Sequence, residues 1–189
     1  QKRTILQGAG VLHSVIRVPD GTSAFSGREP KAVIWTGAMP ANRLRNAVRD
    51  LKIAVGAENP AAVGLQFNAS NQGCVRNVVI EAEADSGVTG LDLGYTDEIG
   101  SLFVQNLAVK GFEYGISTKW PLNSITFENV VLRDQRRLGW WNYHQMVFLR
   151  GLVSYNWVPA IYNERDSWGA MTVMDSQLIG LEPNNADPG

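Results

Sequence analysis

The chain repeats, with small variations, the phrase Val104-Gln105-Asn106-Leu107-Ala108-Val109. Each copy has an apolar first residue, a mostly polar second residue and a central Asp, Asn or Gly. The other copies are Val48-Arg49-Asp50-Leu51-Lys52-Ile53, Val75-Arg76-Asn77-Val78-Val79-Ile80, Phe127-Glu128-Asn129-Val130-Val131-Leu132, Leu149-Arg150-Gly151-Leu152-Val153-Ser154 and Val173-Met174-Asp175-Ser176-Gln177-Leu178. The central residues follow one another at intervals of 22 to 29 residues. This period indicates a solenoid, in which a single repeat cannot bury its apolar face alone and therefore stacks on its neighbours.

The pattern within the phrase predicts strands. An apolar residue followed by a polar one places the first inside and the second outside a coil. Asp, Asn and Gly are the residue types that tolerate the left-handed backbone of a tight bend. We therefore expect the chain to bend at the centre of each phrase and to begin a second strand there. Asparagine side chains stacked at these bends can hydrogen-bond along the stack.

A third short strand follows each phrase, and it usually begins with glycine. The third strands are Gly64-Leu65-Gln66-Phe67, Gly90-Leu91-Asp92-Leu93, Gly115-Ile116-Ser117-Thr118, Gly139-Trp140-Trp141-Asn142 and Ala160-Ile161-Tyr162-Asn163. Three strands per coil predict an all-β fold, a right-handed parallel β-helix of about six to seven coils. A leucine-rich repeat has a similar period, but it needs a helix or a second leucine ladder in each coil, and the sequence shows neither.

The coils are predicted to occupy residues 43–182 of the 189. Residues 1–42 are less regular and are expected to form the first one or two coils, with a protruding loop at residues 19–31. Residues 183–189 form a turn-rich tail. Because a solenoid needs polar caps and neither end supplies one, we expect the chain to be truncated at both ends, as a segment of a longer protein.

Composition excludes several classes of function. The net charge is −1, so no basic surface is expected for nucleic acid or for an anionic membrane. No run of 18 apolar residues is present, so no membrane span is predicted. His13 and His144 have no Cys or His neighbours at ligand spacing, so no metal site is expected. No nucleotide-binding motif is found, and we expect no cofactor.

Several strings resemble those of a known superfamily. They are Arg3-Thr4-Ile5-Leu6-Gln7-Gly8, Asn59-Pro60-Ala61-Ala62-Val63-Gly64-Leu65, Asn71-Gln72-Gly73-Cys74-Val75-Arg76-Asn77-Val78 and Val158-Pro159-Ala160-Ile161-Tyr162-Asn163. They are similar to the pectate-lyase-like β-helix superfamily, nearest to the glycoside hydrolase family 55-like group. The resemblance implies a secreted or cell-surface protein that degrades a β-glucan, and it implies a second β-helix domain of the same full-length chain as partner. No position here matches the catalytic glutamate of that family.

One column of outward-facing residues is the candidate ligand site. The Gly-led strands place Gln66, Asp92, Ser117, Trp141 and Tyr162 outward in successive coils, and Trp120 and Trp168 lie in the loops that follow. Aromatic faces stack on sugar rings, while carboxylates and amides bind hydroxyl groups, so this mixture predicts binding of a polysaccharide or oligosaccharide. Trp140 and Trp157 are predicted to fill the interior.

Hydrolysis of a glycoside requires two carboxyl groups, about 5–5.5 Å apart in a retaining enzyme or about 6.5–9.5 Å in an inverting one. Asp92 with Glu98 is the first candidate catalytic pair, and Glu164 with Asp166 is the second. A solvated, loop-stabilising role is the alternative for Glu98.

Three functions share this fold. The first is a glycoside hydrolase acting on β-glucan, of which this segment alone is expected to be inactive. The second is a non-catalytic glycan-binding protein, an adhesin or tail-spike-like β-helix. The third is a polysaccharide lyase acting on uronate polymers, with Arg133, Arg136 and Arg137 on one turn to bind the carboxylates. Fold alone does not choose among them.

Overall fold

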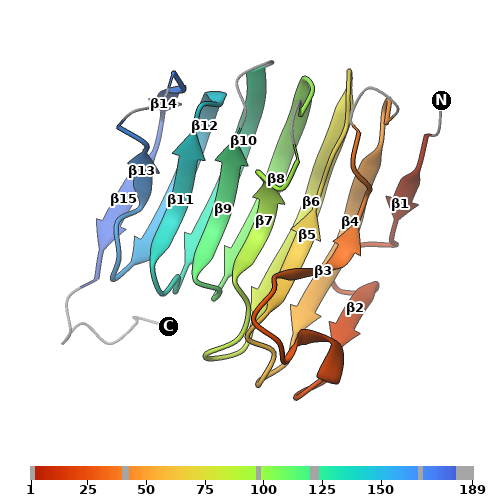
Figure 1. The fold of residues 1–189 in the computed structure, drawn as a ribbon. Coiled ribbons are helices and arrows are strands. Elements are labelled where there is room, and N and C mark those ends of the chain that lie inside the picture. The colour runs from red at the N-terminus through yellow and green to blue at the C-terminus, as the bar shows by residue number, and fades with distance from the viewer. Residues whose placement is uncertain (1–2, 40–42, 97–98, 120–123, 166–167, 182–189) are drawn as a thin grey trace.

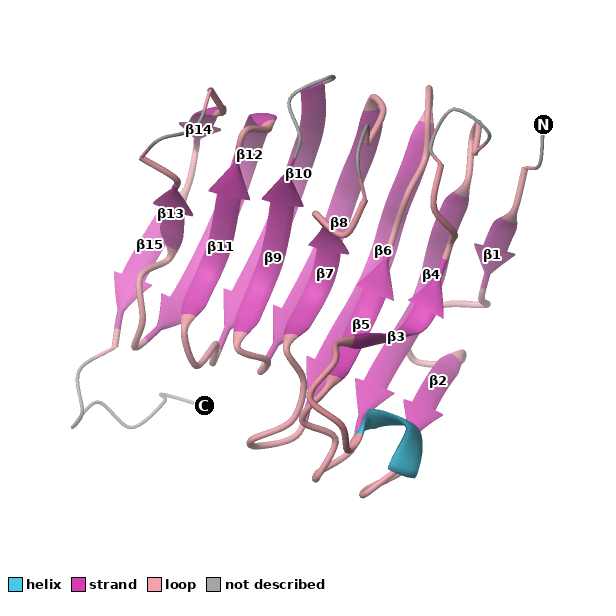
Figure 2. Ribbon diagram, viewed as in Figure 1, coloured by secondary structure: helices cyan, strands magenta, loops and turns pink. Residues whose placement is uncertain are grey.

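The structure is a computed structural model, which describes residues 3–39, 43–96, 99–119, 124–165 and 168–181. Two parallel sheets face each other as layers, and successive coils follow in sequence order along the stack (Figure 1). Among the described residues the only helix is a short 3-10 turn, η1 (Ser23–Phe25), shown in cyan in Figure 2. The fold is therefore an all-β parallel β-helix, as predicted, and the described residues form none of the helices of a leucine-rich repeat.

The nine-stranded sheet has the order β1-β4-β6-β8-β10-β12-β14, with β2 added on β4 and β15 on β12. Its strands are β1 (Ile5–Gln7), β2 (Val15–Val18), β4 (Ala47–Val55), β6 (Gly73–Ala82), β8 (Leu102–Lys110), β10 (Ser124–Arg133), β12 (Met146–Asn156), β14 (Ala170–Met174) and β15 (Gln177–Gly180). The six-stranded sheet has the order β13-β11-β9-β7-β5-β3. Its strands are β3 (Lys31–Trp35), β5 (Ala62–Gln66), β7 (Thr89–Leu93), β9 (Tyr114–Lys119), β11 (Leu138–Tyr143) and β13 (Ile161–Asn163).

The stack contains about five turns, fewer than the six to seven expected. In each central coil, the first two predicted strands form one long strand that bends in the middle. These long strands are β4, β6, β8, β10 and β12. At the two ends of the stack the same path is divided into short strands, β1 with β2 and β14 with β15. Counting phrases therefore overestimates the number of complete coils, because the phrase at Asp175 belongs to an incomplete one.

The predicted bends are confirmed. The six central residues all have left-handed backbone, with φ from 49° at Asp175 to 74° at Gly151. The side chains of three of them donate to the residue one coil earlier, Asn77 to Asp50 at 2.7 Å, Asn106 to Asn77 at 2.8 Å and Asn129 to Asn106 at 3.1 Å. This asparagine ladder ties neighbouring coils together at the point where each long strand bends.

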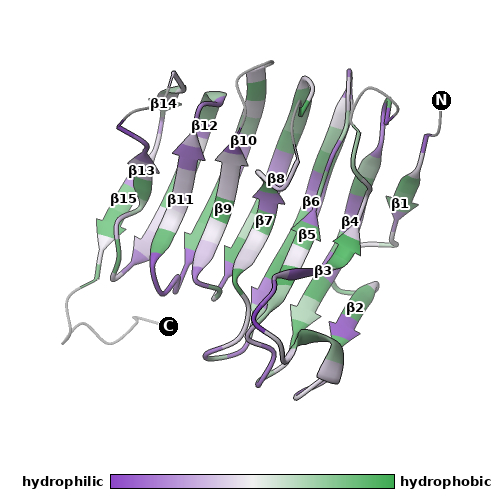
Figure 3. Cartoon of the chain, in the orientation of Figure 1, coloured by the Kyte–Doolittle hydropathy of each residue, from purple (hydrophilic) through white to green (hydrophobic). Residues whose placement is uncertain are grey.

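The core lies between the two sheets. Along the strands hydrophobic residues alternate with hydrophilic ones (Figure 3). The first apolar position of the phrase is buried at Val48, Val75, Val104, Phe127 and Leu149, each at most 1% exposed. Val173 occupies the same position in the last coil but is 38% exposed, because no further coil of the described chain covers it. Phe25, in the 3-10 turn, also packs into this core.

The repeated glycines of the third strands lie inside β5, β7, β9 and β11, one or two residues after each strand begins, at a position where no side chain fits. A Cβ atom placed on Gly115 would lie 2.5 Å from the carbonyl oxygen of Gly139 and 3.1 Å from a methyl group of Leu132. In the same way, a Cβ atom placed on Gly64 would lie 2.7 Å from the carbonyl oxygen of Gly90, and one placed on Gly90 would lie 2.9 Å from that of Gly115. The close approach of consecutive backbones explains the glycine at this position in successive repeats.

Gly115→Ala is expected to lower the free energy of unfolding by about 1–3 kcal/mol, because the new methyl group overpacks a site bounded by backbone. Urea unfolding followed by circular dichroism measures the change. Gly27→Ala is the matched control, since Gly27 lies in an exposed loop with no atom within 4 Å of the added Cβ. Equal stability of the two variants would contradict this account of the glycine positions.

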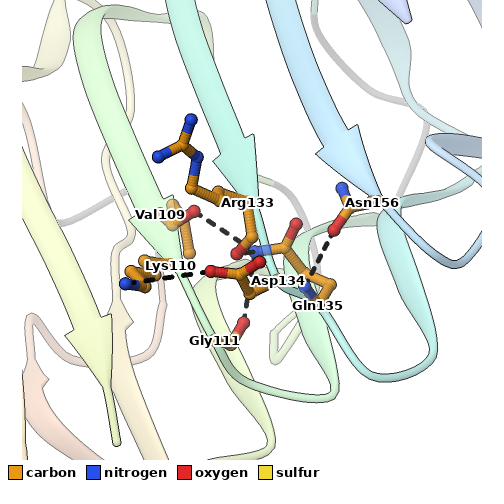
Figure 4. A network of polar contacts seen from close by, with 7 residues as sticks. All are labelled: Val109, Lys110, Gly111, Arg133, Asp134, Gln135 and Asn156. Carbon is orange, nitrogen blue, oxygen red and sulfur yellow. Dashed lines mark hydrogen bonds and ion pairs between the residues drawn. The ribbon is translucent and has the colours of Figure 1, made fainter. Parts of the chain in front are cut away.

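A buried glutamine fixes the corner between β10 and β11 (Figure 4). The Nε2 atom of Gln135 lies 3.2, 3.1 and 2.8 Å from the carbonyl oxygens of Val109, Gly111 and Arg133. Its backbone N–H donates to Oδ1 of Asn156 at 2.8 Å. These bonds connect the turns of three consecutive coils. They also supply hydrogen-bond donors to buried carbonyl groups. They therefore set the position from which β11 enters the six-stranded sheet.

Candidate functional site

The outer face of the six-stranded sheet carries one continuous column of aromatic and polar side chains. Strand pairing places six residues in register: Trp35, Gln66, Asp92, Ser117, Trp141 and Tyr162. The residue before each of them faces the core, for example Leu65, Leu91 and Trp140, which are all 0% exposed. The outer column therefore contains all five residues that the sequence placed there, and it gains Trp35 at its N-terminal end.

Asp92 lies in the middle of the outer column and is partly buried. Its Oδ2 atom accepts a hydrogen bond from Nε2 of Gln66 at 3.1 Å, and Oδ1 accepts from the backbone N–H of Gly94 at 2.8 Å. Burial raises the pKa of the Asp92 carboxyl above its ordinary value of 3.8, although the two hydrogen bonds and the charge of Lys119 oppose the shift. A carboxyl group with a raised pKa gives up its proton less readily to water and is the better candidate for a general acid.

This shift predicts a pH dependence of stability. Because the pKa of Asp92 is raised in the folded chain, the proton's contribution to stability is full below pH 3.8 and is lost as the pH rises through the folded-state value. Asp92→Asn cannot titrate, so the stability of the wild type relative to this variant falls over that window. Urea unfolding of both proteins from about pH 3 to about pH 7 measures the difference, which must be constant if burial does not affect Asp92.

Glu164 joins the two aromatic residues at the C-terminal end of the outer column. Its Oε2 atom accepts a hydrogen bond from Nε1 of Trp141 at 3.0 Å, and Oε1 accepts from the hydroxyl of Tyr162 at 3.2 Å. The Tyr114 ring lies beside Trp141, with 5.9 Å between ring centroids and 31° between the planes. The Arg137 guanidinium lies 5.4 Å from the centroid of Tyr114. These contacts hold the indole of Trp141 in one orientation on the outer face.

A second group of aromatic side chains lies at the C-terminal end of β11, whose last residue is Tyr143. The Tyr143 and His144 ring centroids are 3.9 Å apart, and those of His144 and Trp168 are 5.5 Å apart. The backbone N–H of Trp168 donates to Nδ1 of His144 at 2.9 Å, while its side chain is 81% exposed. The Lys119 ammonium lies 5.4 Å from the centroid of the Tyr143 ring. Trp168 is thus anchored through its backbone while its indole faces solvent.

The predicted catalytic pairs are only partly described. Glu98, Trp120 and Asp166 lie outside the described residues, so their predicted roles remain predictions. Asp92 and Glu164 are both described, but β7 and β13 are separated by three strand spacings, about 14 Å. The two carboxylates also have separate hydrogen-bond donors. They therefore serve different parts of the outer face.

Trp140 and Trp157 differ in their placement. Trp140 is 0% exposed and fills the interior, as predicted. The same prediction for Trp157 is wrong, since that side chain is 51% exposed. The reason is that β12 ends at Asn156, and Trp157 begins the connection to β13 instead of continuing the alternation of a strand.

One arginine of the cluster predicted for a uronate site, Arg136, stabilises the fold. The two terminal nitrogens of Arg136 donate to the carbonyl oxygens of Ser86 and Gly87 at 2.9 and 2.8 Å. The Arg133 guanidinium lies 4.9 Å from the centroid of the Tyr155 ring. Arg136 therefore holds the connection between β6 and β7, and the lyase hypothesis gains no support from it.

Two features of the face were missed by sequence reasoning. Trp35 belongs to the outer column, and the alternation of Ile34 and Trp35 was the available signal, but β3 lacks the glycine that marks four of the other five third strands. Glu164 was considered only as an acid, whereas it orients Trp141 and Tyr162. A contact between side chains of different coils has no signal in a single sequence.

Comparison with known proteins gave no relative. A scan against protein-family models, a search of curated proteins and a search of solved structures found no match. Within the described ranges, no three His, Cys, Asp or Glu side chains gather as a metal site. No helix in the described part of the chain is long and apolar enough to cross a membrane. The geometry and chemistry of the outer column therefore carry the functional argument.

Proposed function

We propose that the outer face of the six-stranded sheet binds a polysaccharide, and that the chain is a carbohydrate-active β-helix segment of a secreted or cell-surface protein. The observation that carries this proposal is the register of the outer column, which aligns three aromatic residues with an amide, a carboxyl and a hydroxyl group. Aromatic rings cover the apolar faces of sugar rings, and the polar groups bind their hydroxyls.

The solenoid suits a polymeric ligand. Each coil adds one position to the outer column at an interval of about 4.8 Å, so the column offers a row of neighbouring contacts. The Trp141 indole is already oriented by Glu164 and Tyr114. Binding then costs little ordering of this side chain, because its orientation is set before the ligand arrives.

Trp141→Ala is expected to weaken binding of laminarin, a β-1,3-glucan, by about tenfold or more, because removing an oriented aromatic contact from a binding face typically costs more than about 1 kcal/mol. Isothermal titration calorimetry measures the affinity. Trp157→Ala is the matched control, since Trp157 is an exposed tryptophan outside the outer column. No binding of any β-glucan by the wild type, or equal binding by the Trp141 and Trp157 variants, would refute the proposal.

We propose further that the chain belongs to the pectate-lyase-like superfamily, nearest to the glycoside hydrolase family 55-like group. In that case a second β-helix domain of the full-length protein completes the site for hydrolysis of β-glucan. The parallel β-helix fold supports this assignment. The raised pKa of Asp92 supports a role as general acid, which protonates the oxygen of the departing sugar.

Hydrolysis is tested by the release of reducing sugar from laminarin by the full-length protein. Asp92→Asn is expected to reduce the rate at least about 100-fold, since general acid catalysis typically contributes that much. An unchanged rate in this variant would exclude Asp92 as the acid. Binding without release by the wild type would instead favour the non-catalytic, adhesin-like function.

A further inference from the structure

We infer that the bound glycan lies across all six strands, parallel to the axis of the β-helix, and that Trp35 makes its distal contact. The inference rests on the proposed glycan binding and adds to it the direction of the ligand and its minimum length. It assigns a binding role to a residue at the opposite end of the outer column from Trp141 and Tyr162.

The spacing of the aromatic residues motivates this assignment. Trp35 lies four strands from Trp141 in the sheet order β3-β5-β7-β9-β11, a separation of about 19 Å. The intervening positions are Gln66, Asp92 and Ser117, which are partly exposed and polar. Aromatic platforms thus stand at both ends of a polar strip. A linear ligand that touches both ends must cross the strands in the direction in which the coils stack.

Trp35 is exposed, but its backbone is firmly held. Its side chain is 60% exposed, whereas Ile34 packs against the core. Directly after it, the Thr36 N–H donates to the carbonyl oxygen of Gln66 at 3.1 Å, and the Thr36 hydroxyl accepts from the Asn68 N–H at 2.7 Å. These bonds tie the end of β3 to β5 and to the residues that follow it.

The connection after β7 adds a further anchor to the same segment. The hydroxyl of Tyr95 donates to the carbonyl oxygen of Gly37 at 2.6 Å. Burial, and to a lesser degree the neighbouring Asp92 charge, raises the pKa of Tyr95 above its ordinary value of 10. The position of Trp35 relative to Asp92 is therefore set by three consecutive coils, and an exposed ring on a rigid segment is a preorganised contact.

Length selectivity follows from this arrangement. A glycan shorter than about 19 Å reaches only one aromatic end of the outer column, whereas a longer one contacts both ends at once. The ligand class is therefore an extended polymer or a long oligomer. Mono- and disaccharides reach one end only, and the Trp141 end offers two aromatic rings, Trp141 and Tyr162, against one at Trp35.

The test uses β-1,3-linked gluco-oligosaccharides of increasing length, from the disaccharide upward, in calorimetric titrations of this chain. For the wild type we expect the affinity to rise by about tenfold once the oligosaccharide spans the outer column. In Trp35→Ala this rise is lost while short oligosaccharides bind as before. Trp35→Phe keeps an aromatic ring and retains part of the rise. Trp157→Ala, the control, behaves as the wild type does.

Two failures are distinguishable. If the wild type binds no oligosaccharide of any length, the proposed glycan binding itself is wrong, and the inference fails with it. If the wild type and Trp35→Ala bind short and long oligosaccharides with the same affinities, glycan binding stands and the extended site is wrong. Thermal unfolding of each variant verifies that it is folded, as expected for substitution of an exposed side chain.

Discussion

Trp140→Ala is expected to lower the free energy of unfolding by about 3–5 kcal/mol, the usual cost of removing a large aromatic side chain from a core. Trp140 is 0% exposed, and its ring meets Phe127 edge to face with 4.4 Å between centroids. Its indole N–H donates to the hydroxyl of Thr118 at 3.0 Å, so the truncation also leaves a buried hydroxyl without this donor. Urea unfolding followed by tryptophan fluorescence and circular dichroism measures the loss.

The adjacent residue supplies the control. Trp141 has the same side chain, but it faces outward in the outer column, and Trp141→Ala is expected to cost no more than about 1 kcal/mol. The pair separates the two roles, because the Trp140 substitution destabilises the fold and the Trp141 substitution weakens glycan binding. The reverse order of stabilities would mean that the alternation of β11 is assigned to the wrong faces.

Asn106→Ala is expected to lower the free energy of unfolding by about 2–4 kcal/mol, from left-handed strain of about 1 kcal/mol and two lost hydrogen bonds of about 0.5–1.5 kcal/mol each. Asn106 has a φ of 53°. It donates to Asn77 at 2.8 Å and accepts from Asn129 at 3.1 Å. Denaturant unfolding at neutral pH measures the total.

Two further variants divide this cost. Asn106→Gly removes both hydrogen bonds but adopts the left-handed backbone without strain, so it is expected to lie between the wild type and the alanine variant. Asn106→Asp keeps the acceptor for Asn129 and loses the donor to Asn77. Stability of the alanine variant equal to that of the wild type would show that the asparagine ladder contributes nothing to the stack.

Much of the architecture could be predicted because its determinants are local. The residue type at Asn77 or Asn106 permits a left-handed bend, and the alternation around it assigns inward and outward faces. The outer column followed from the same alternation in the Gly-led strands, and strand pairing places its five predicted members in register. These features depend on the sequence within a single repeat.

The rest depends on how different repeats meet. Glu164 follows the end of β13, and it contacts Trp141 of the preceding coil and Tyr162 of its own coil. No periodicity in the sequence indicates these contacts. Trp157 was misplaced because the end of a strand is poorly marked in the sequence. Trp35 was missed because the first coil departs from the repeat pattern, although its register with Gln66 is the same as in later coils.

The most direct test of glycan binding by the outer column is a titration of the isotope-labelled chain with laminari-oligosaccharides, followed by the indole N–H signals in nitrogen–proton correlation spectra. Each tryptophan contributes one such signal, so the ligand position is observed without mutation. We expect the Trp141 signal to shift with every ligand and the Trp35 signal to shift only with long ones, while the Trp157 signal is unchanged. Shifts confined to Trp157, or no shift at a saturating concentration, would contradict the assignment of the outer column as a glycan-binding face.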